Sequence, residues 1–213
     1  MPTVQTLLKI ILKNMSALFF LMLLSCFDFY PQKENTSQPQ TSVEFLETEF
    51  MEINFSKPRV KSYWVTTPDI IICDRVVPIR KVKAAVEFWN RLGYTFGEIK
   101  EESDAYQCMQ QRTNEIVFKL PSTTIPIGDN LAVTRTYIEK NQRINLRAEI
   151  YIWPRSHQKI LVIEHELGHA IGWSHTGISY HLMNPRWERI GHHTSGLNKR
   201  EYIIQAEILR PRE

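Results

Sequence analysis

Three histidines and a glutamate lie close together in the sequence between positions 165 and 175. His165 and His169 are four positions apart, so on a helix their side chains lie on one face and can bind the same ion. Glu166 lies about 100° around the helix from His165, beside that ion, where it is free to hold a water molecule. These residue types in the pattern H-E-x-x-H indicate a zinc ion and a water activated by a carboxylate.

The third histidine requires a change in chain direction. His175 lies ten positions after His165, and on an unbroken helix it would point well away from it. The chain must therefore leave the helix before His175, and Gly172 stands at that point because glycine accepts the positive φ of a helix C-terminal turn. The alternative is an ordinary amphipathic helix with surface histidines. It is disfavoured because three histidines, a glutamate and a glycine are all in register.

The stretch from His165 to His175 resembles the zinc-binding consensus of the metzincin metalloproteases. A second element agrees, because the sequence L-M-N-P at 182–185 is similar to the Met-turn of that family. Met183 follows His175 by eight residues, which is similar to the short spacing in the matrixin branch. Thr176 also fits that branch better than the acidic residue expected of astacins or adamalysins.

This resemblance implies a site and a reaction. One catalytic Zn²⁺ would be held by His165, His169 and His175, with Glu166 as general base and Met183 as an apolar floor beneath the histidines. The implied function is a zinc-dependent endopeptidase that hydrolyses peptide bonds in a protein or peptide substrate. The alternative is a non-catalytic, surface-displayed binding module on the same fold. The intact ligands and general base favour the enzyme, because a decayed site usually loses one of them first.

Hydrophobic periodicity and turn residues predict the elements that must position these residues. Strands are expected at 60–65, 70–73, 94–99, 115–120, 131–138 and 144–153. Helices are expected from Pro78 to Gly93, around the histidines after a cap at Ser156, and from Asn198, which begins a capping box with Glu201.

The order of these elements is similar to that of a metzincin catalytic domain. We therefore expect an α+β fold with a mixed, mostly parallel twisted sheet and an antiparallel edge strand. The fold would also contain a backing helix, the zinc-site helix, the Met-turn and a C-terminal helix. The strand at 131–138 is expected to border the cleft, where it would pair with an extended substrate. The resemblance covers roughly residues 57–211 and is strong only at about 149–186.

The N-terminus is typical of an export signal. Lys9 and Lys13 precede an apolar run at 15–24, which is shorter than the roughly 20 residues that span a bilayer. The residues Leu-Leu-Ser before Cys26 resemble the lipobox of bacterial lipoproteins. We expect residues 1–26 to be a signal peptide with Cys26 as the lipidated residue. The protein would then be an envelope lipoprotein, on the outer surface or in the periplasm; the alternative is a cleaved signal and secretion.

The segment at 27–56 separates this signal from the domain expected at 57–213. Its first part is polar and poor in apolar residues, which indicates a tether. Its second part, from Val43 to Phe55, mixes glutamates with apolar residues, and it is either a short helix lying on the domain or a short inhibitory pro-segment. The Pro-Arg-Cys-Gly cysteine switch of matrixins is missing from the sequence.

The remaining cysteines, Cys73 and Cys108, would be exported to an oxidising compartment, which favours a disulfide between them over two unpaired thiols. Residues 103–152 contain no histidine, so the extra structural metal ions of matrixins are not expected there. The other histidines are expected in surface or hydrogen-bonding roles; they are His157, His181, His192 and His193.

The composition is that of a globular protein. Of the 213 residues, 43% are hydrophobic and 23% are charged, which suits one domain with extensions. The net charge is only +3 and no basic run of five residues occurs, so a nucleic-acid partner is not expected. We expect a monomer.

Overall fold

The computed structural model describes residues 43–47 and 57–211. The predicted signal peptide with Cys26, and most of the predicted tether or pro-segment, lie outside these residues. Within the described part of the chain, no helix is both long and apolar enough to cross a membrane.

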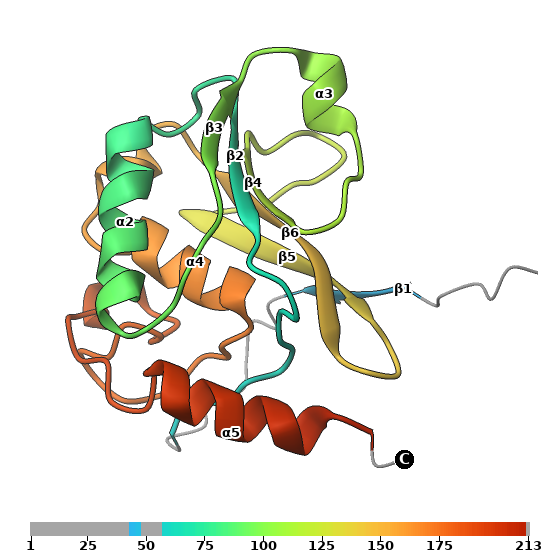
Figure 1. The fold of residues 1–213 in the computed structure, drawn as a ribbon. Helices are drawn as coiled ribbons and strands as arrows, with labels where there is room; N and C mark the ends of the chain where they lie inside the picture. Colours follow the sequence, from blue (N-terminus) through green and yellow to red (C-terminus); the bar gives the residue numbers. More distant parts are fainter. Residues whose placement is uncertain (1–42, 48–56, 212–213) are drawn as a thin grey trace, which may run out of the picture. The chain divides into compact units, whose positions relative to one another are not determined.

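Six strands form one sheet in the order β1-β5-β6-β4-β2-β3 (Figure 1). The four strands from β6 to β3 are mutually parallel, whereas β5 is antiparallel to both of its neighbours. The α+β class and the mixed, mostly parallel sheet are therefore confirmed. The strand bounds are β1 Val43–Glu47, β2 Asp69–Cys73, β3 Ile99–Glu102, β4 Glu115–Lys119, β5 Ala132–Glu139 and β6 Ile144–Ile152.

The antiparallel strand β5 is not the edge strand that the sequence predicted. β1 pairs with its outer side, from Val43 opposite Glu139 to Glu47 opposite Arg135. A helix that begins at Val43 is also excluded, because residues 43–47 are extended and add a strand to the sheet, while the rest of the predicted segment to Phe55 lies outside the described residues. The sheet includes five residues that precede the expected start of the domain at 57.

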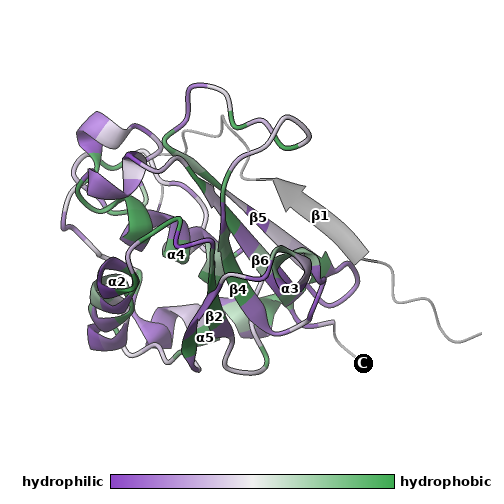
Figure 2. Ribbon diagram, turned by 90° about the horizontal axis from the view of Figure 1, so that it is seen from above, coloured by the Kyte–Doolittle hydropathy of each residue, from purple (hydrophilic) through white to green (hydrophobic). Residues whose placement is uncertain are grey.

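Two helices pack on one face of the sheet and form the main core with it. α2 (Ile79–Arg91) begins after Pro78, whose fixed φ suits a helix start, and α4 (Val162–Ile171) packs against it. Trp89 of α2 is completely buried, and its Nε1 donates a hydrogen bond of 2.9 Å to the backbone oxygen of Glu164 in α4. Figure 2 shows hydrophobic residues along the strands and a largely hydrophilic outer surface on α2.

A C-terminal helix, α5 (Lys199–Leu209), packs against the end of α4. The predicted cap at Asn198 is confirmed, since its Oδ1 accepts the Glu201 N–H at 3.0 Å. The Tyr202 hydroxyl of α5 donates to the carbonyl of Ile171 at 3.1 Å. This bond satisfies one of the carbonyls that the last turn of α4 leaves without a partner in the helix.

Two of the predicted strands are wrong. Residues 60–65 form only single bridges, with Val60 opposite Trp173 and Tyr63 opposite Ile144, because this segment crosses between two different neighbours. Residues 94–98 are a loop, and the strand begins at Ile99 instead. The reason is that the Tyr94 side chain turns into the core, where its hydroxyl donates to the Leu197 carbonyl at 2.9 Å.

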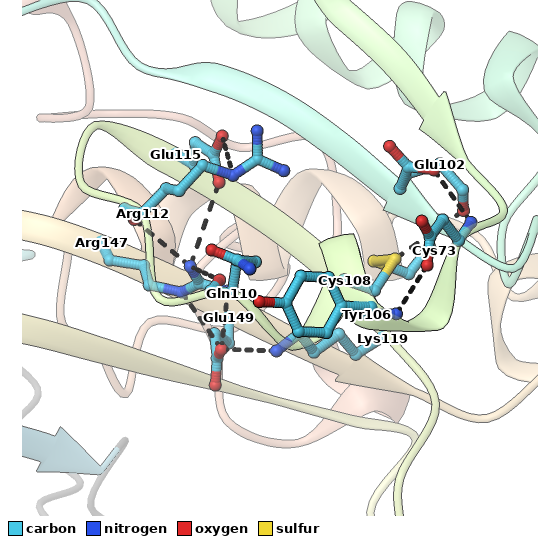
Figure 3. Close-up of a disulfide and its surroundings, with 11 residues drawn as sticks. Cys73, Glu102, Tyr106, Cys108, Gln110, Arg112, Glu115, Lys119, Arg147 and Glu149 are labelled. Carbon is cyan, nitrogen blue, oxygen red and sulfur yellow. Dashed lines mark hydrogen bonds and ion pairs between the residues drawn. A yellow bond between two sulfur atoms is a disulfide. The ribbon is translucent and has the colours of Figure 1, made fainter.

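The opposite face of the sheet is covered by the segment at 103–114, which includes the short helix α3 (Ala105–Met109) (Figure 3). Arg147 of β6 anchors this segment by donating to the carbonyls of Gln110 at 2.6 Å and Arg112 at 3.2 Å. Arg147 also pairs with Glu149 at 3.0 Å, and Lys119 pairs with the same carboxylate at 2.7 Å. Burial opposes ionisation here, yet these partners and the Tyr151 hydroxyl hold the pKa of Glu149 below its usual value.

A disulfide joins Cys73 at the end of β2 to Cys108 in α3, with a Cα–Cα distance of 5.9 Å. Both residues are buried in a small apolar cluster with Ile71 and Val117. The disulfide therefore fixes the covering segment at one end, while Arg147 holds it at the other.

We predict that the double variant Cys73→Ala/Cys108→Ala folds but is less stable. The disulfide closes a loop with a sequence separation of 35 residues. Losing that constraint on the unfolded chain should lower the free energy of unfolding by roughly 3–4 kcal/mol. Urea titration followed by circular dichroism measures the difference, and reduction of the unmodified protein should give a similar loss. Equal stability of variant and parent would contradict the prediction.

Candidate metal centre

Three imidazole rings converge beside α4. His165 and His169 project from the helix, and His175 reaches them from the loop that follows. The Nε2 atom of His169 lies 3.0 Å from the Nε2 atom of His165 and 3.0 Å from that of His175. The structure therefore brings together the three residues that the sequence selected, and they are close enough to bind a metal ion.

The tautomers of two of these rings favour a cation at their centre. The Nδ1 of His165 contacts the carbonyl of Leu182 at 2.7 Å, and the Nδ1 of His169 contacts the carbonyl of Trp173 at 2.8 Å. A carbonyl only accepts, so each Nδ1 carries the proton and each Nε2 presents a lone pair. Two lone pairs 3.0 Å apart repel each other unless a cation lies near both. Three neutral imidazole nitrogens with an open fourth position suit zinc.

The helix that carries the first two histidines ends at Gly172. This residue has φ of 123°, which is accessible to glycine, and its N–H bonds back to Gly168 and His169. A Cβ atom at Gly172 would lie 1.9 Å from the carbonyl oxygen of Ser62, so the crossing segment leaves no room for a side chain. At the other end the expected cap is wrong, because the helix starts after Leu161 while Ser156 lies in a separate 3-10 turn.

The loop that carries His175 is held in place by the segment that precedes β2. The Ser174 N–H donates to the carbonyl of Arg59 at 2.8 Å, and the Arg59 N–H donates to the Ser174 hydroxyl at 3.1 Å. These two bonds fix the loop one residue before His175. The segment at Arg59, just before the predicted strand at 60–65, therefore positions a candidate metal ligand.

Met183 lies underneath the helix. It is completely buried, and a Cβ atom placed on Gly168 would lie 2.5 Å from its Sδ atom, so a glycine is needed for this approach. The Met183 carbonyl accepts the Thr176 N–H at 2.9 Å, which links the turn to the loop after the third histidine. The preceding residue, Leu182, provides the carbonyl that orients His165.

His181 has a structural role in the same turn. Its ring is completely buried, its Nδ1 accepts the Met183 N–H at 3.0 Å, and its Nε2 donates to the Ser195 carbonyl at 3.0 Å. Burial lowers the pKa of His181 from its usual value, which keeps the ring neutral. The expectation of a hydrogen-bonding role for this histidine is confirmed.

Glu166 lies next to the histidines and is buried. Its Oε2 accepts a hydrogen bond of 2.6 Å from the Thr134 hydroxyl of β5. Burial raises the pKa of Glu166 to about 7, although the bond from Thr134 acts in the opposite direction. Sequence reasoning did not find Thr134. Only the packing of β5 against α4 shows its contact with Glu166.

The histidines and Glu166 open into a cavity of about 370 Å³. The start of β5 forms one wall, and the segment after Met183 forms the other. The lining residues outside the metal centre include Leu131, Ala132 and Val133 on the β5 side, and Pro185, Trp187 and Ile190 on the opposite side. Cys73 and Cys108 are not among them, so the disulfide is separate from the candidate site.

No protein-family model matches this chain, and no curated protein matches it either.

We predict a pH-dependent effect of Glu166→Gln on the stability of the metal-free protein. With the pKa raised from 4.5 to about 7, folded Glu166 keeps a proton that the unfolded chain releases between these values. The free energy of unfolding of the parent protein therefore falls as pH rises through this range. Glutamine has no such titration and should gain about 3 kcal/mol relative to the parent between pH 5 and pH 8. Urea unfolding with a chelator at both pH values measures this; a pH-independent difference would contradict it.

Proposed function

We propose that this protein is a zinc-dependent endopeptidase with a metzincin-like, matrixin-type catalytic domain. The observation that supports it most strongly is the convergence of three Nε2 atoms beside a buried carboxylate in an open cavity. Two further residues support the proposal. Met183 lies under the helix and Gly172 ends it, as the resemblance to metzincins predicted for both.

The chain's own residues have distinct parts in the proposed reaction. Zinc, when held by the three histidines, would polarise the peptide carbonyl and lower the pKa of a water molecule to about 7. Glu166 accepts the proton of that water as general base and then passes it to the leaving amine. Thr134 holds one oxygen of the Glu166 carboxylate at 2.6 Å, which orients the carboxylate within the buried site. Proton transfer by a positioned group contributes about 10²–10⁴-fold to a rate.

The substrate would bind as an added strand. Leu131, Ala132 and Val133 line the cavity, and the outer edge of β5 at these positions lies beyond the last residue paired with β1. An extended peptide along this edge would form main-chain hydrogen bonds with β5 and place one of its peptide bonds at the metal centre.

A non-catalytic binding module is the second candidate. It would use the same cavity without requiring Glu166. The hydrogen bond that fixes this carboxylate beside the histidines favours the enzyme, because a site that only binds a metal gains nothing from a buried, oriented base.

We predict that Glu166→Gln removes peptide cleavage and leaves the metal in place. The protein from residue 27 onward should contain about one zinc per chain and cleave a denatured protein, and a chelator should stop cleavage. Glu166→Gln should lower kcat at least about 100-fold with unchanged zinc content, because only the base is lost. Mass spectrometry of the products and metal analysis by plasma emission give the two readouts.

The matched control is Glu164→Gln, which makes the same chemical change two residues earlier, at a side chain outside the cavity lining. It should cleave at nearly the parental rate. A second variant, His169→Ala, should lose zinc and activity together. Cleavage that persists in Glu166→Gln would exclude the proposed mechanism, and zinc binding without any cleavage would favour the binding module.

We also propose that the protein is exported and anchored to a membrane through Cys26, with secretion after signal cleavage as the alternative. Cys26→Ser should move the protein from the membrane fraction to the soluble fraction, because the only acceptor proposed for the lipid is removed. Ser25→Ala is the control, since it keeps both a small residue and Cys26 and should stay with the membranes. Immunoblots of separated fractions measure the distribution, and no change in Cys26→Ser would argue against the anchor.

A further inference from the structure

His181 and the candidate metal ligand His165 contact the same peptide group from opposite sides. The Nδ1–H of His165 donates to the Leu182 carbonyl at 2.7 Å, and the Met183 N–H donates to the Nδ1 of His181 at 3.0 Å. That carbonyl and that N–H belong to the single peptide unit between Leu182 and Met183. The unit is planar and trans, so the two groups point in opposite directions and rotate together.

The His181 ring is itself fixed at its far end. Its Nε2–H donates to the Ser195 carbonyl at 3.0 Å, and the side chain is completely buried. A carbonyl only accepts and a backbone N–H only donates, so the neutral ring carries its proton on Nε2 and its lone pair on Nδ1. The other tautomer would place its Nδ1–H against the Met183 N–H. The ring therefore stabilises one orientation of the Leu182–Met183 peptide.

The neighbouring peptide units of the turn are held by other residues. The Leu182 N–H donates to the His193 carbonyl at 2.8 Å, and the Met183 carbonyl accepts the Thr176 N–H at 2.9 Å. These bonds fix the path of the chain before and after the Leu182–Met183 peptide. The peptide itself can still rotate through ψ of Leu182 and φ of Met183, which are soft torsions. The two histidine rings, one on each side, restrain that rotation.

A chain of hydrogen bonds therefore connects the Ser195 carbonyl to the ring of His165. Each bond in such a chain polarises the next, so donation by the Met183 N–H makes the Leu182 carbonyl a better acceptor. A partner of this kind orients a metal-binding histidine and raises its basicity as a ligand. The orientation matters here because the Nε2 of His165 lies only 3.0 Å from that of His169, and rotation of the ring would move the lone pair away from this point.

We propose that His181 is a positioning residue for the metal centre, which acts on His165 through the Leu182–Met183 peptide. The inference rests on the proposed function, and it concerns a residue that does not itself contact the metal ion. It differs from a purely structural role in the turn, because loss of the acceptor on His181 weakens metal binding as well as the fold.

Two substitutions separate the two ends of the ring. The Oδ1 of asparagine is as many bonds from the backbone as Nδ1, so His181→Asn keeps an acceptor for the Met183 N–H and loses the donor to Ser195. The carboxamide of glutamine reaches the position of Nε2 instead, so His181→Gln loses the acceptor. Zinc affinity, measured by competition with a chelator, should fall at least about tenfold in His181→Gln and stay within about threefold of the parent in His181→Asn.

Asn184 provides a matched control in the same turn. Its buried side chain also makes two hydrogen bonds, to the Ile178 carbonyl at 2.9 Å and from the Arg186 N–H at 2.9 Å. Asn184→Ala should lower the free energy of unfolding of the metal-free protein much as His181→Gln does, yet keep the zinc affinity of the parent. His181→Leu, which fills the space without an acceptor, should bind zinc as weakly as His181→Gln and replaces it if glutamine prevents folding.

A second measurement includes the unmodified protein. NMR spectra of the histidine ring nitrogens should show the proton of His181 on Nε2 and that of His165 on Nδ1 in the zinc-bound protein. In His181→Gln the resonance of the His165 Nδ1–H should move upfield, because its hydrogen bond to the Leu182 carbonyl weakens. His181→Asn should leave this resonance near its position in the parent.

Parental zinc affinity in His181→Gln, or a proton on the Nδ1 of His181 in the unmodified protein, would overturn this inference while the proposed function stands. An equal loss of affinity in Asn184→Ala or in His181→Asn would overturn it too, since the effect would then follow from the stability of the turn alone. A parent protein that binds no zinc would instead overturn the proposed function, and the inference with it.

Discussion

The arrangement of the candidate site depends on bringing three imidazole lone pairs to one point. A single helix can present His165 and His169 together, but it cannot present a third ligand ten positions on. The chain solves this by ending α4 at Gly172, whose positive φ turns it back toward the first two rings. The turn is then fixed from outside, because the segment at Ser62 packs directly on the glycine and leaves no space for a side chain. The convergence of the three histidines therefore requires both a local conformation and a distant neighbour.

The rest of the fold keeps these groups in place from two sides. Below the helix, the close approach at Gly168 admits Met183, and the neighbouring carbonyl of Leu182 selects the tautomer of His165. Above it, β5 contributes the Thr134 hydroxyl to Glu166. The far face of the sheet uses a different means of stabilisation, namely a disulfide and the buried ion pairs around Glu149. Neither the disulfide nor these ion pairs line the cavity.

The sequence alone was enough for the features that depend on local spacing. The three histidines, the glycine that ends the helix and the Asn198 cap all follow from residues within a few turns of one another. Sequence-based prediction failed where a contact between residues far apart in the chain decides the structure. Residues 60–65 have the composition of a strand, yet they bridge two separate neighbours at Val60 and Tyr63. The contact of Thr134 with Glu166 and the position of β1 on β5 depend in the same way on pairings that no periodicity reveals.

The outer edge of β5 shows how this fold treats a strand edge beside the candidate site. An exposed strand edge is needed to bind an extended substrate, but the same edge invites pairing with unrelated chains. Here β1 pairs with β5 from Arg135 to Glu139, whereas Ala132 and Val133 at the start of β5 line the cavity. Its sequence also includes Glu44 and Glu47, and charged residues are a common means of discouraging edge-to-edge association. This pairing protects the strand edge away from the candidate metal centre, because the residues of β5 that pair with β1, Arg135 to Glu139, do not line the cavity.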